Sequence, residues 1–209
     1  FFLSVRLHKL QILPEQSMNV TFDHTYEEAA NALTHGFGAV LSLIAGIALI
    51  VLAALSGNPY QIVSAAVYSI SLVLLYTAST LYHSARGERI KRRLEIFDHC
   101  AIFVLIAGTY TPFTLITLQG PVGWSLFGVV WGLASIGVLF KLIFATRFQI
   151  LSTLAYIAMG WLVVFAAGPL VSALSIPTIG LLVAGGLAYT VGTLFFHNTR
   201  IPYAHAIWY

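Results

Sequence analysis

The chain has 209 residues, of which 59% are hydrophobic and only 8% are charged. Soluble domains are about 45–50% apolar and about 25% charged, so this composition excludes an ordinary soluble domain and predicts one membrane-embedded unit. The formal net charge of +3 is too small for a nucleic-acid-binding protein, and the single cysteine, Cys100, excludes a disulfide framework and a CxxC metal motif.

Six stretches of the chain are long and apolar enough to form transmembrane helices, which need about 20 mostly apolar residues. In chain order they are Gly36–Leu55, Ile62–Tyr82, Ala101–Leu118, Val122–Phe144, Ile150–Val171 and Ile179–Phe196. Short turn-forming segments follow the first, third and fifth stretches, at Ser56–Pro59, Gln119–Pro121 and Ser175–Pro177. Because short connections join antiparallel neighbours, the sequence predicts an all-α, polytopic helical bundle.

The charged residues predict the orientation of these spans. Lysine and arginine occur before the first span and after the second, fourth and sixth, with Lys141 and Arg147 assigned to the group after the fourth. The seven acidic residues follow the same alternation. Because basic residues are enriched in cytoplasmic loops, these segments are predicted to face the cytoplasm, and the N-terminus with them.

The sequence also predicts two unusual ends. Residues 1–24 are expected to form a cytoplasmic tail before a transmembrane domain at 25–209. Phe1–Gln16 lacks the basic and apolar regions of a signal peptide. Met18 directly precedes the polar lead-in to the first span, so we expect Met18 to be the natural start and residues 1–17 to lie outside the native chain. At Tyr209 the sequence stops where another helix is expected to begin.

Polar residues gather at the predicted cytoplasmic ends of four helices. They are histidine, acid, amide and hydroxyl side chains: Glu28, Asn31, His35, Ser79, His83, Asp98 and His205. Polar groups in hydrocarbon are costly and often functional, and histidine with carboxylate suits Zn²⁺. Each residue also has an ordinary interpretation, because a histidine at a helix end is commonly interfacial, Asp98 can pair with Arg92 or Arg93, and Glu28 favours a helix N-terminus.

Several motifs resemble the haemolysin III family, the bacterial branch of the progestin and adipoQ receptor (PAQR) family. They are Glu28-x-x-Asn31-x-x-x-His35, Ser79-Thr-Leu-Tyr-His83, Phe97-Asp98-His99, Ala107–Phe113, Ala158–Trp161 and Arg200–Trp208. The resemblance extends from about Thr25 to Trp208. It implies a multi-pass protein of the bacterial cytoplasmic (inner) membrane with a seven-helix fold, of which six full spans are present here and the seventh is truncated.

The resemblance also implies a zinc ion near the cytoplasmic face, held by three histidines. His83 and His205 match two of these ligands, whereas the third falls on Tyr209. The family aspartate that holds the zinc-bound water matches Asp98, and its serine matches Ser79. A phenol ionises only near pH ~10, so zinc binding is expected to be weakened in this sequence. Glu28, Asn31 and His35 are expected to surround and orient the ligands.

Three functions fit this resemblance. The first is a zinc-dependent hydrolase of membrane lipid amides or esters, or a membrane-lipid homeostasis protein, because eukaryotic relatives are linked to ceramide hydrolysis. Asp98 and Ser79 are then the catalytic residues. The second is a membrane-acting cytolysin or pore, although the spans lack the polar stripe that a helical pore needs. The third is a lipid-sensing bundle in which zinc is structural. The residues do not decide between the hydrolase and the sensor.

Overall fold

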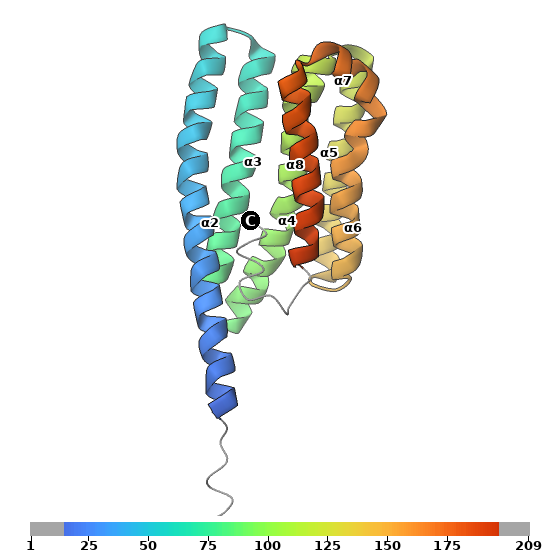
Figure 1. The fold of residues 1–209 in the computed structure, drawn as a ribbon. Helices are drawn as coiled ribbons and strands as arrows, with labels where there is room; N and C mark the ends of the chain where they lie inside the picture. Colours follow the sequence, from blue (N-terminus) through green and yellow to red (C-terminus); the bar gives the residue numbers. More distant parts are fainter. Residues whose placement is uncertain (1–14, 197–209) are drawn as a thin grey trace, which may run out of the picture.

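The computed structural model describes residues 15–196, with side chains described for residues 25–193. Every regular element in this range is helical (Figure 1). In chain order the elements are α2 (Glu15–Ser56), α3 (Pro59–Ser84), α4 (Glu88–Pro112), the π-helix η1 (Phe113–Leu118), α5 (Gly120–Phe144), α6 (Gln149–Gly160), the 3₁₀-helix η2 (Trp161–Ala166), α7 (Ala167–Ala173) and α8 (Ile176–Phe196). By length and composition, six helical segments can cross a membrane.

The six predicted spans are confirmed, because each lies within the helices that form these segments, the sixth within α8. Several helices extend beyond the apolar stretches, among them α2 and α4. α4 begins at Glu88 and continues through Asp98, so Asp98 lies inside the helix, three residues before the apolar stretch that begins at Ala101. Glutamate, lysine and arginine are good helix formers, which explains why the charged segment continues the apolar helix.

The predicted turn between the first two spans has a clear local cause. Asn58 is the N-cap of α3, and its side-chain oxygen accepts a hydrogen bond from the backbone N–H of Tyr60 at 2.9 Å. Pro59 occupies the first turn of the helix, where its missing N–H has no helical partner to lose. These residues stop α2 and start α3, so the two helices lie antiparallel and side by side (Figure 1).

Small residues allow α2, α3 and α4 to pack closely. A Cβ atom added at Gly46 of α2 would lie 2.8 Å from the Cβ atom of Ser69 on α3. A Cβ atom at Gly108 of α4 would collide with Ser71 of α3. Glycine and serine at helix contacts are typical of membrane bundles, where backbones must come close to gain packing energy.

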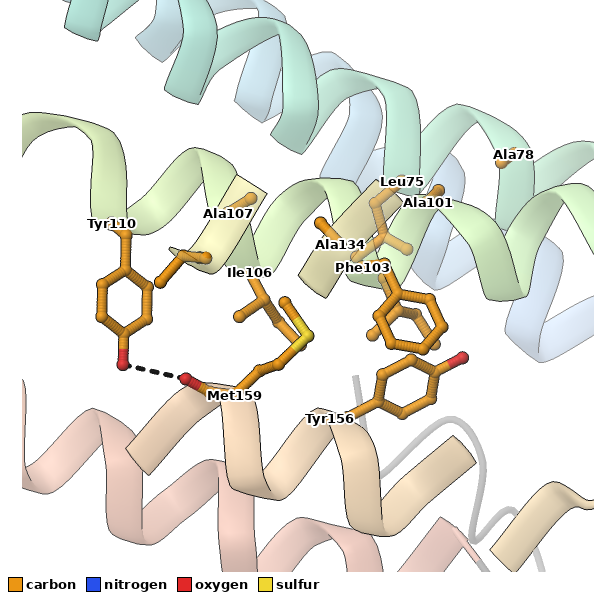
Figure 2. Close-up of a cluster of buried hydrophobic side chains, with 12 residues drawn as sticks. Leu75, Ala78, Ala101, Phe103, Ile106, Ala107, Tyr110, Ala134, Tyr156 and Met159 are labelled. Carbon is orange, nitrogen blue, oxygen red and sulfur yellow. Dashed lines mark hydrogen bonds between the residues drawn. The ribbon is translucent and has the colours of Figure 1, made fainter. Parts of the chain in front are cut away.

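The apolar core surrounds α4. Phe103 and Ala107 of α4 are buried against Ala78 of α3, Val130 of α5 and Met159 of α6. Figure 2 shows Phe103 of α4 beside Tyr156 of α6, with ring centroids 4.5 Å apart and the ring planes tilted by 59°. The third span therefore occupies the centre of the bundle, and its position fixes the polar residues near its beginning.

The fifth span is interrupted between α6 and α7 by η2, and a tyrosine of α4 compensates the interruption. The Tyr110 hydroxyl oxygen lies 2.9 Å from the Met159 carbonyl oxygen and 2.7 Å from that of Gly160. It also accepts a hydrogen bond from the backbone N–H of Val163 at 2.8 Å. In hydrocarbon, backbone groups released by a broken helix need a protein partner, and Tyr110 provides one (Figure 2).

Candidate functional site

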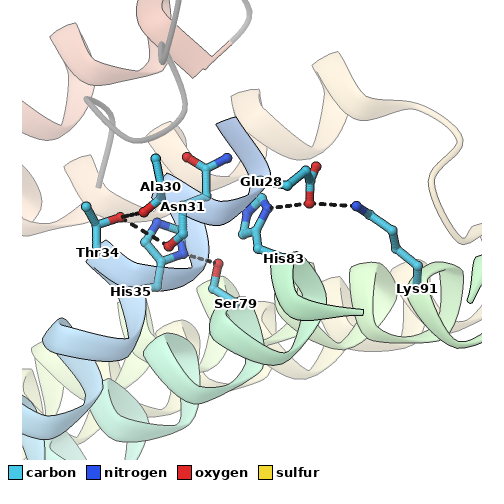
Figure 3. A network of polar contacts seen from close by, with 8 residues as sticks. All are labelled: Glu28, Ala30, Asn31, Thr34, His35, Ser79, His83 and Lys91. Atoms are coloured by element: carbon cyan, nitrogen blue, oxygen red, sulfur yellow. Dashed lines mark hydrogen bonds and ion pairs between the residues drawn. The ribbon is translucent and has the colours of Figure 1, made fainter. Parts of the chain in front are cut away.

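Polar side chains of three helices meet at one end of the bundle. Asn31 and His35 of α2, Ser79 and His83 of α3, and Asp98 of α4 are all buried, with His35 and Ser79 completely so. The spacing of four residues in Asn31–His35 and in Ser79–His83 puts each pair on one helix face. Because α2 and α3 are antiparallel, the end of α3 lies against the first turns of the apolar part of α2 (Figure 3).

Ser79 connects the first and third spans. Its Oγ atom lies 2.6 Å from Nδ1 of His35, and the same hydroxyl group hydrogen-bonds the carboxyl group of Asp98. A hydroxyl group has one proton to donate and can also accept. When Asp98 is ionised, Ser79 therefore donates a hydrogen bond to the carboxylate and accepts one from the Nδ1–H group of His35, which fixes the tautomer of that histidine.

His83 belongs to a second chain of contacts. Its Nδ1 atom lies 3.2 Å from Oε2 of Glu28, and the same oxygen accepts a hydrogen bond from Nζ of Lys91 at 2.6 Å (Figure 3). An ionised carboxylate can only accept, so the proton of His83 is on Nδ1. Nε2 of His83 is then the nitrogen able to ligate a metal, an arrangement common for metal-binding histidines.

The two sets of side-chain contacts form one cluster. The rings of His35 and His83 lie edge to face with centroids 5.3 Å apart. We call the following set the polar cluster: Glu28, Asn31, His35, Ser79, His83, Lys91 and Asp98. Three helices separated by long sequence distances contribute to it, so any change in their packing alters all its contacts.

The donor atoms of the polar cluster suit zinc in type but not in number. Histidine nitrogen and carboxylate oxygen are ordinary zinc ligands. Within the described residues, Oδ1 of Asp98 is buried and accepts no hydrogen bond, as expected for an atom that faces an absent ligand or water. However, the described residues contain no group of three histidine, cysteine or acidic side chains able to hold a metal ion. A metal held here would therefore need a further ligand from outside residues 25–193.

The structure brings together six of the seven predicted site residues. Glu28, Asn31 and His35 lie on α2, Ser79 and His83 on α3, and Asp98 on α4, all at the same end of the bundle. The seventh, His205, lies outside the described residues, as does Tyr209. Their predicted contributions to a metal site remain predictions. The ordinary pairing considered for Asp98 with Arg92 or Arg93 is not among the ion pairs of the described residues.

Two lysines have roles that sequence reasoning missed. Lys91 was grouped with loop residues, but it holds Glu28 against His83. Lys141 was assigned to the segment after the fourth span, but it is fully buried within α5. Its Nζ atom has no hydrogen-bond partner among the described residues, and its charge interacts with that of Glu95 on α4. A signal existed, since Lys141 lies within the predicted span Val122–Phe144.

Comparisons with known proteins match nearly the whole chain. The family model described as Haemolysin-III related matches residues 23–208. Over 183 residues the chain is 49% identical to Hemolysin-3 of Bacillus cereus, covering 88% of this chain and 84% of that protein. It is also 49% identical to the Hemolysin-3 homolog of Bacillus subtilis (strain 168), covering 88% and 86%. The human monocyte to macrophage differentiation factor is 30% identical over 194 residues, covering 88% and 77%. No solved structure gives a significant match.

Proposed function

The chain belongs to the haemolysin III family, and from this premise we propose that it is a zinc-dependent hydrolase that cleaves an amide or ester bond of a membrane lipid. The observation that carries the proposal is the buried carboxyl group of Asp98, whose Oδ1 atom has no hydrogen-bond partner among the described residues. An unsatisfied buried carboxyl oxygen costs stability, so its retention favours a role in binding or chemistry.

The metal would be held by His83 and His205, with a further ligand beyond those that the described residues provide. Bound zinc supplies a Lewis acid and lowers the pKa of a water molecule to about 7. Glu28 keeps the proton of His83 on Nδ1, and Lys91 fixes Glu28 by a hydrogen bond of 2.6 Å. The two residues therefore orient His83 from the side away from the ligand, as outer partners of metal-binding histidines do.

Asp98 and Ser79 perform the proton transfer and the orientation. Oδ1 of Asp98 would accept a proton from the attacking water as a general base and would return it to the leaving amine or alcohol when the C–N or C–O bond breaks. Ser79 holds the other side of this carboxyl group through its hydroxyl, and His35 fixes Ser79 in turn at 2.6 Å. The site lies at the end of membrane-spanning helices, so a lipid substrate can reach it from the bilayer.

The test separates metal binding from catalysis. Purified full-length protein in lipid nanodiscs is analysed for zinc and assayed with a ceramide and with a matched ester. With zinc supplied in the buffer we expect up to about one zinc ion per chain, bound weakly because Tyr209 replaces the third histidine, lost in His83→Gln and retained in Asp98→Asn. Asp98→Asn should lower the hydrolysis rate by about 10²–10⁴-fold, the usual contribution of a general base. His99→Gln is the matched control, a buried histidine of α4.

Each failure has a distinct meaning. Wild-type protein without zinc refutes the metal site and the hydrolase together. Zinc that depends on His83, with no hydrolysis of either lipid class, refutes the hydrolase and leaves a bundle with structural zinc, suited to lipid sensing. Loss of zinc in His99→Gln as well as in His83→Gln shows a general loss of structure.

We also propose that the end bearing the polar cluster faces the cytoplasm of a bacterial cell, with the protein in its cytoplasmic membrane. The support is the excess of basic residues at this end. The single native cysteine, Cys100, is buried, so Gly87→Cys and Ser175→Cys introduce one exposed thiol at each end. In intact cells a membrane-impermeant maleimide should label Ser175→Cys alone. Labelling of Gly87→Cys without permeabilisation reverses the orientation.

A further inference from the structure

The first turns of α4 have two chemically different faces. Lys91, Glu95 and Asp98, at spacings of four and three residues, share one face. On this face Lys91 and Asp98 belong to the polar cluster. Arg89, Arg93 and Phe97 are separated by four residues each and form a different face, which is exposed. The same short helical segment therefore faces the polar cluster on one side and the surroundings of the bundle on the other.

The exposed face is strongly basic and its arginines are not neutralised within the protein. Arg86 in the turn before α4, and Arg89, Arg92 and Arg93 in the helix, are all exposed. We call these four residues the arginine patch. Among the described residues no ion pair joins any of them to an acid. The acids nearest in sequence are Glu88, which is exposed, and Glu95, whose charge attracts Arg92. The patch therefore retains an excess of positive charge.

Apolar side chains identify the partner of this patch. Ile90 is 61% exposed and Phe97 is 43% exposed, and both lie between or beside the arginines on α4. A partner in water, such as a nucleic acid or a soluble anion, would leave these apolar groups uncovered. The patch also lies where a membrane-spanning helix begins, so lipid headgroups and upper acyl chains are adjacent. Arginine binds phosphate through a two-pronged hydrogen bond, which lysine cannot form.

We propose that the arginine patch binds the phosphate headgroups of anionic phospholipids, with Ile90 and Phe97 contacting the acyl chains. This binding does not depend on the proposed hydrolase activity or on zinc. It has a consequence for the polar cluster, because Lys91 lies within the same helical turns and is bonded to Glu28, which contacts His83. Headgroups bound by the patch hold the start of α4 in place and thereby keep Lys91 against Glu28.

The experiment measures lipid preference directly. Full-length protein is reconstituted in phosphatidylcholine vesicles with a trace of spin-labelled phosphatidylglycerol or spin-labelled phosphatidylcholine, and the motionally restricted fraction is recorded. We expect preferential restriction of phosphatidylglycerol at low salt, weakened at high salt because surface charges are screened. The variant R86Q/R89Q/R92Q/R93Q should lower the preference about fivefold or more, since each basic residue near an anionic surface contributes.

A matched pair of single substitutions separates the patch from net charge. Arg93→Gln and Arg147→Gln remove the same charge at the same end of the bundle, and both residues are exposed, but only Arg93 belongs to the patch. We expect a lower preference in Arg93→Gln and no change in Arg147→Gln. Equal loss in the two variants, or unchanged preference in the fourfold variant, overturns the proposal. Displacement of labelled lipid by soluble glycerol phosphate overturns it too, because the patch then binds free anions.

Discussion

In the first three spans, buried polar side chains of α2, α3 and α4 contact one another. In the fifth span, by contrast, the interrupted backbone forms hydrogen bonds with a single side chain of α4. His35, Ser79 and Asp98 are linked through one hydroxyl group. At the interruption, the Tyr110 hydroxyl group contacts the backbone of Met159, Gly160 and Val163. Both arrangements place polar atoms inside a membrane bundle. The first consists of contacts among side chains of three helices, whereas the second consists of contacts between one hydroxyl group and the backbone.

The comparison teaches that burial of polar groups has two purposes in this protein. The contacts of Tyr110 satisfy every group they reach, which is the structural requirement in hydrocarbon. The polar cluster is less complete, because Oδ1 of Asp98 and Oδ1 of Asn31 have no hydrogen-bond partner among the described residues. A structural network is expected to be fully satisfied, and this incompleteness separates the polar cluster from the Tyr110 contact. It is not confined to the cluster, because Ser69 and Lys141 also lack a hydrogen-bond partner among the described residues.

The largest effect is expected at the structural contact. Tyr110→Phe should lower the free energy of unfolding by about 3 kcal/mol, because it leaves several buried backbone groups without their partner, at about 1–3 kcal/mol each. Unfolding in mixed detergent micelles measures the change. Tyr60→Phe, at a half-exposed position on α3, is the control and should have little effect. Equal stability of Tyr110→Phe and wild type would show that the Tyr110 contacts do not stabilise the fold.

A smaller loss is expected within the polar cluster. Ser79→Ala should lower the free energy of unfolding by about 1–2 kcal/mol, because Nδ1 of His35 loses its partner in a buried site. Ser69→Ala is a matched control on the same helix, since Ser69 is also buried but its hydroxyl group has no partner among the described residues. The control should be neutral or slightly stabilising. If both alanine variants are equally stable, the Ser79 contacts do not support the fold.

The smallest effect has the opposite sign. In protein freed of metal by a chelator, Asp98→Asn should raise the free energy of unfolding by about 1 kcal/mol, because residues kept for function commonly lower stability. A neutral amide removes a buried charge that is incompletely hydrogen-bonded. Glu88→Gln, an exposed change on the same helix, provides the comparison. Destabilisation by Asp98→Asn would indicate that Asp98 is structural, like Tyr110.

Most of the fold could be predicted from the sequence, and part of the site. The six spans follow from apolar stretches separated by turns such as Asn58-Pro59. The residues of the polar cluster were predicted, apart from Lys91, because histidine and aspartate are conspicuous in an apolar chain. The interruption at Trp161–Ala166 was not predicted, although Pro169 in the same span lacks the N–H that would bond the carbonyl group of Phe165. The contact of the interrupted backbone with the distant Tyr110 could not be predicted from the sequence. The buried position of Lys141 was missed because its charge was taken as evidence of a loop.

The sequence by itself determined that the chain is a membrane protein, how many times it can cross, and at which end its charges gather. These properties depend on hydropathy and charge summed along the chain, without reference to neighbours in space. Only the tertiary structure decided that Ser79 joins His35 to Asp98, that Glu28 joins His83 to Lys91, and that Tyr110 serves the fifth span. Such pairings depend on how antiparallel helices are rotated and staggered, which close contacts such as Gly108 with Ser71 set.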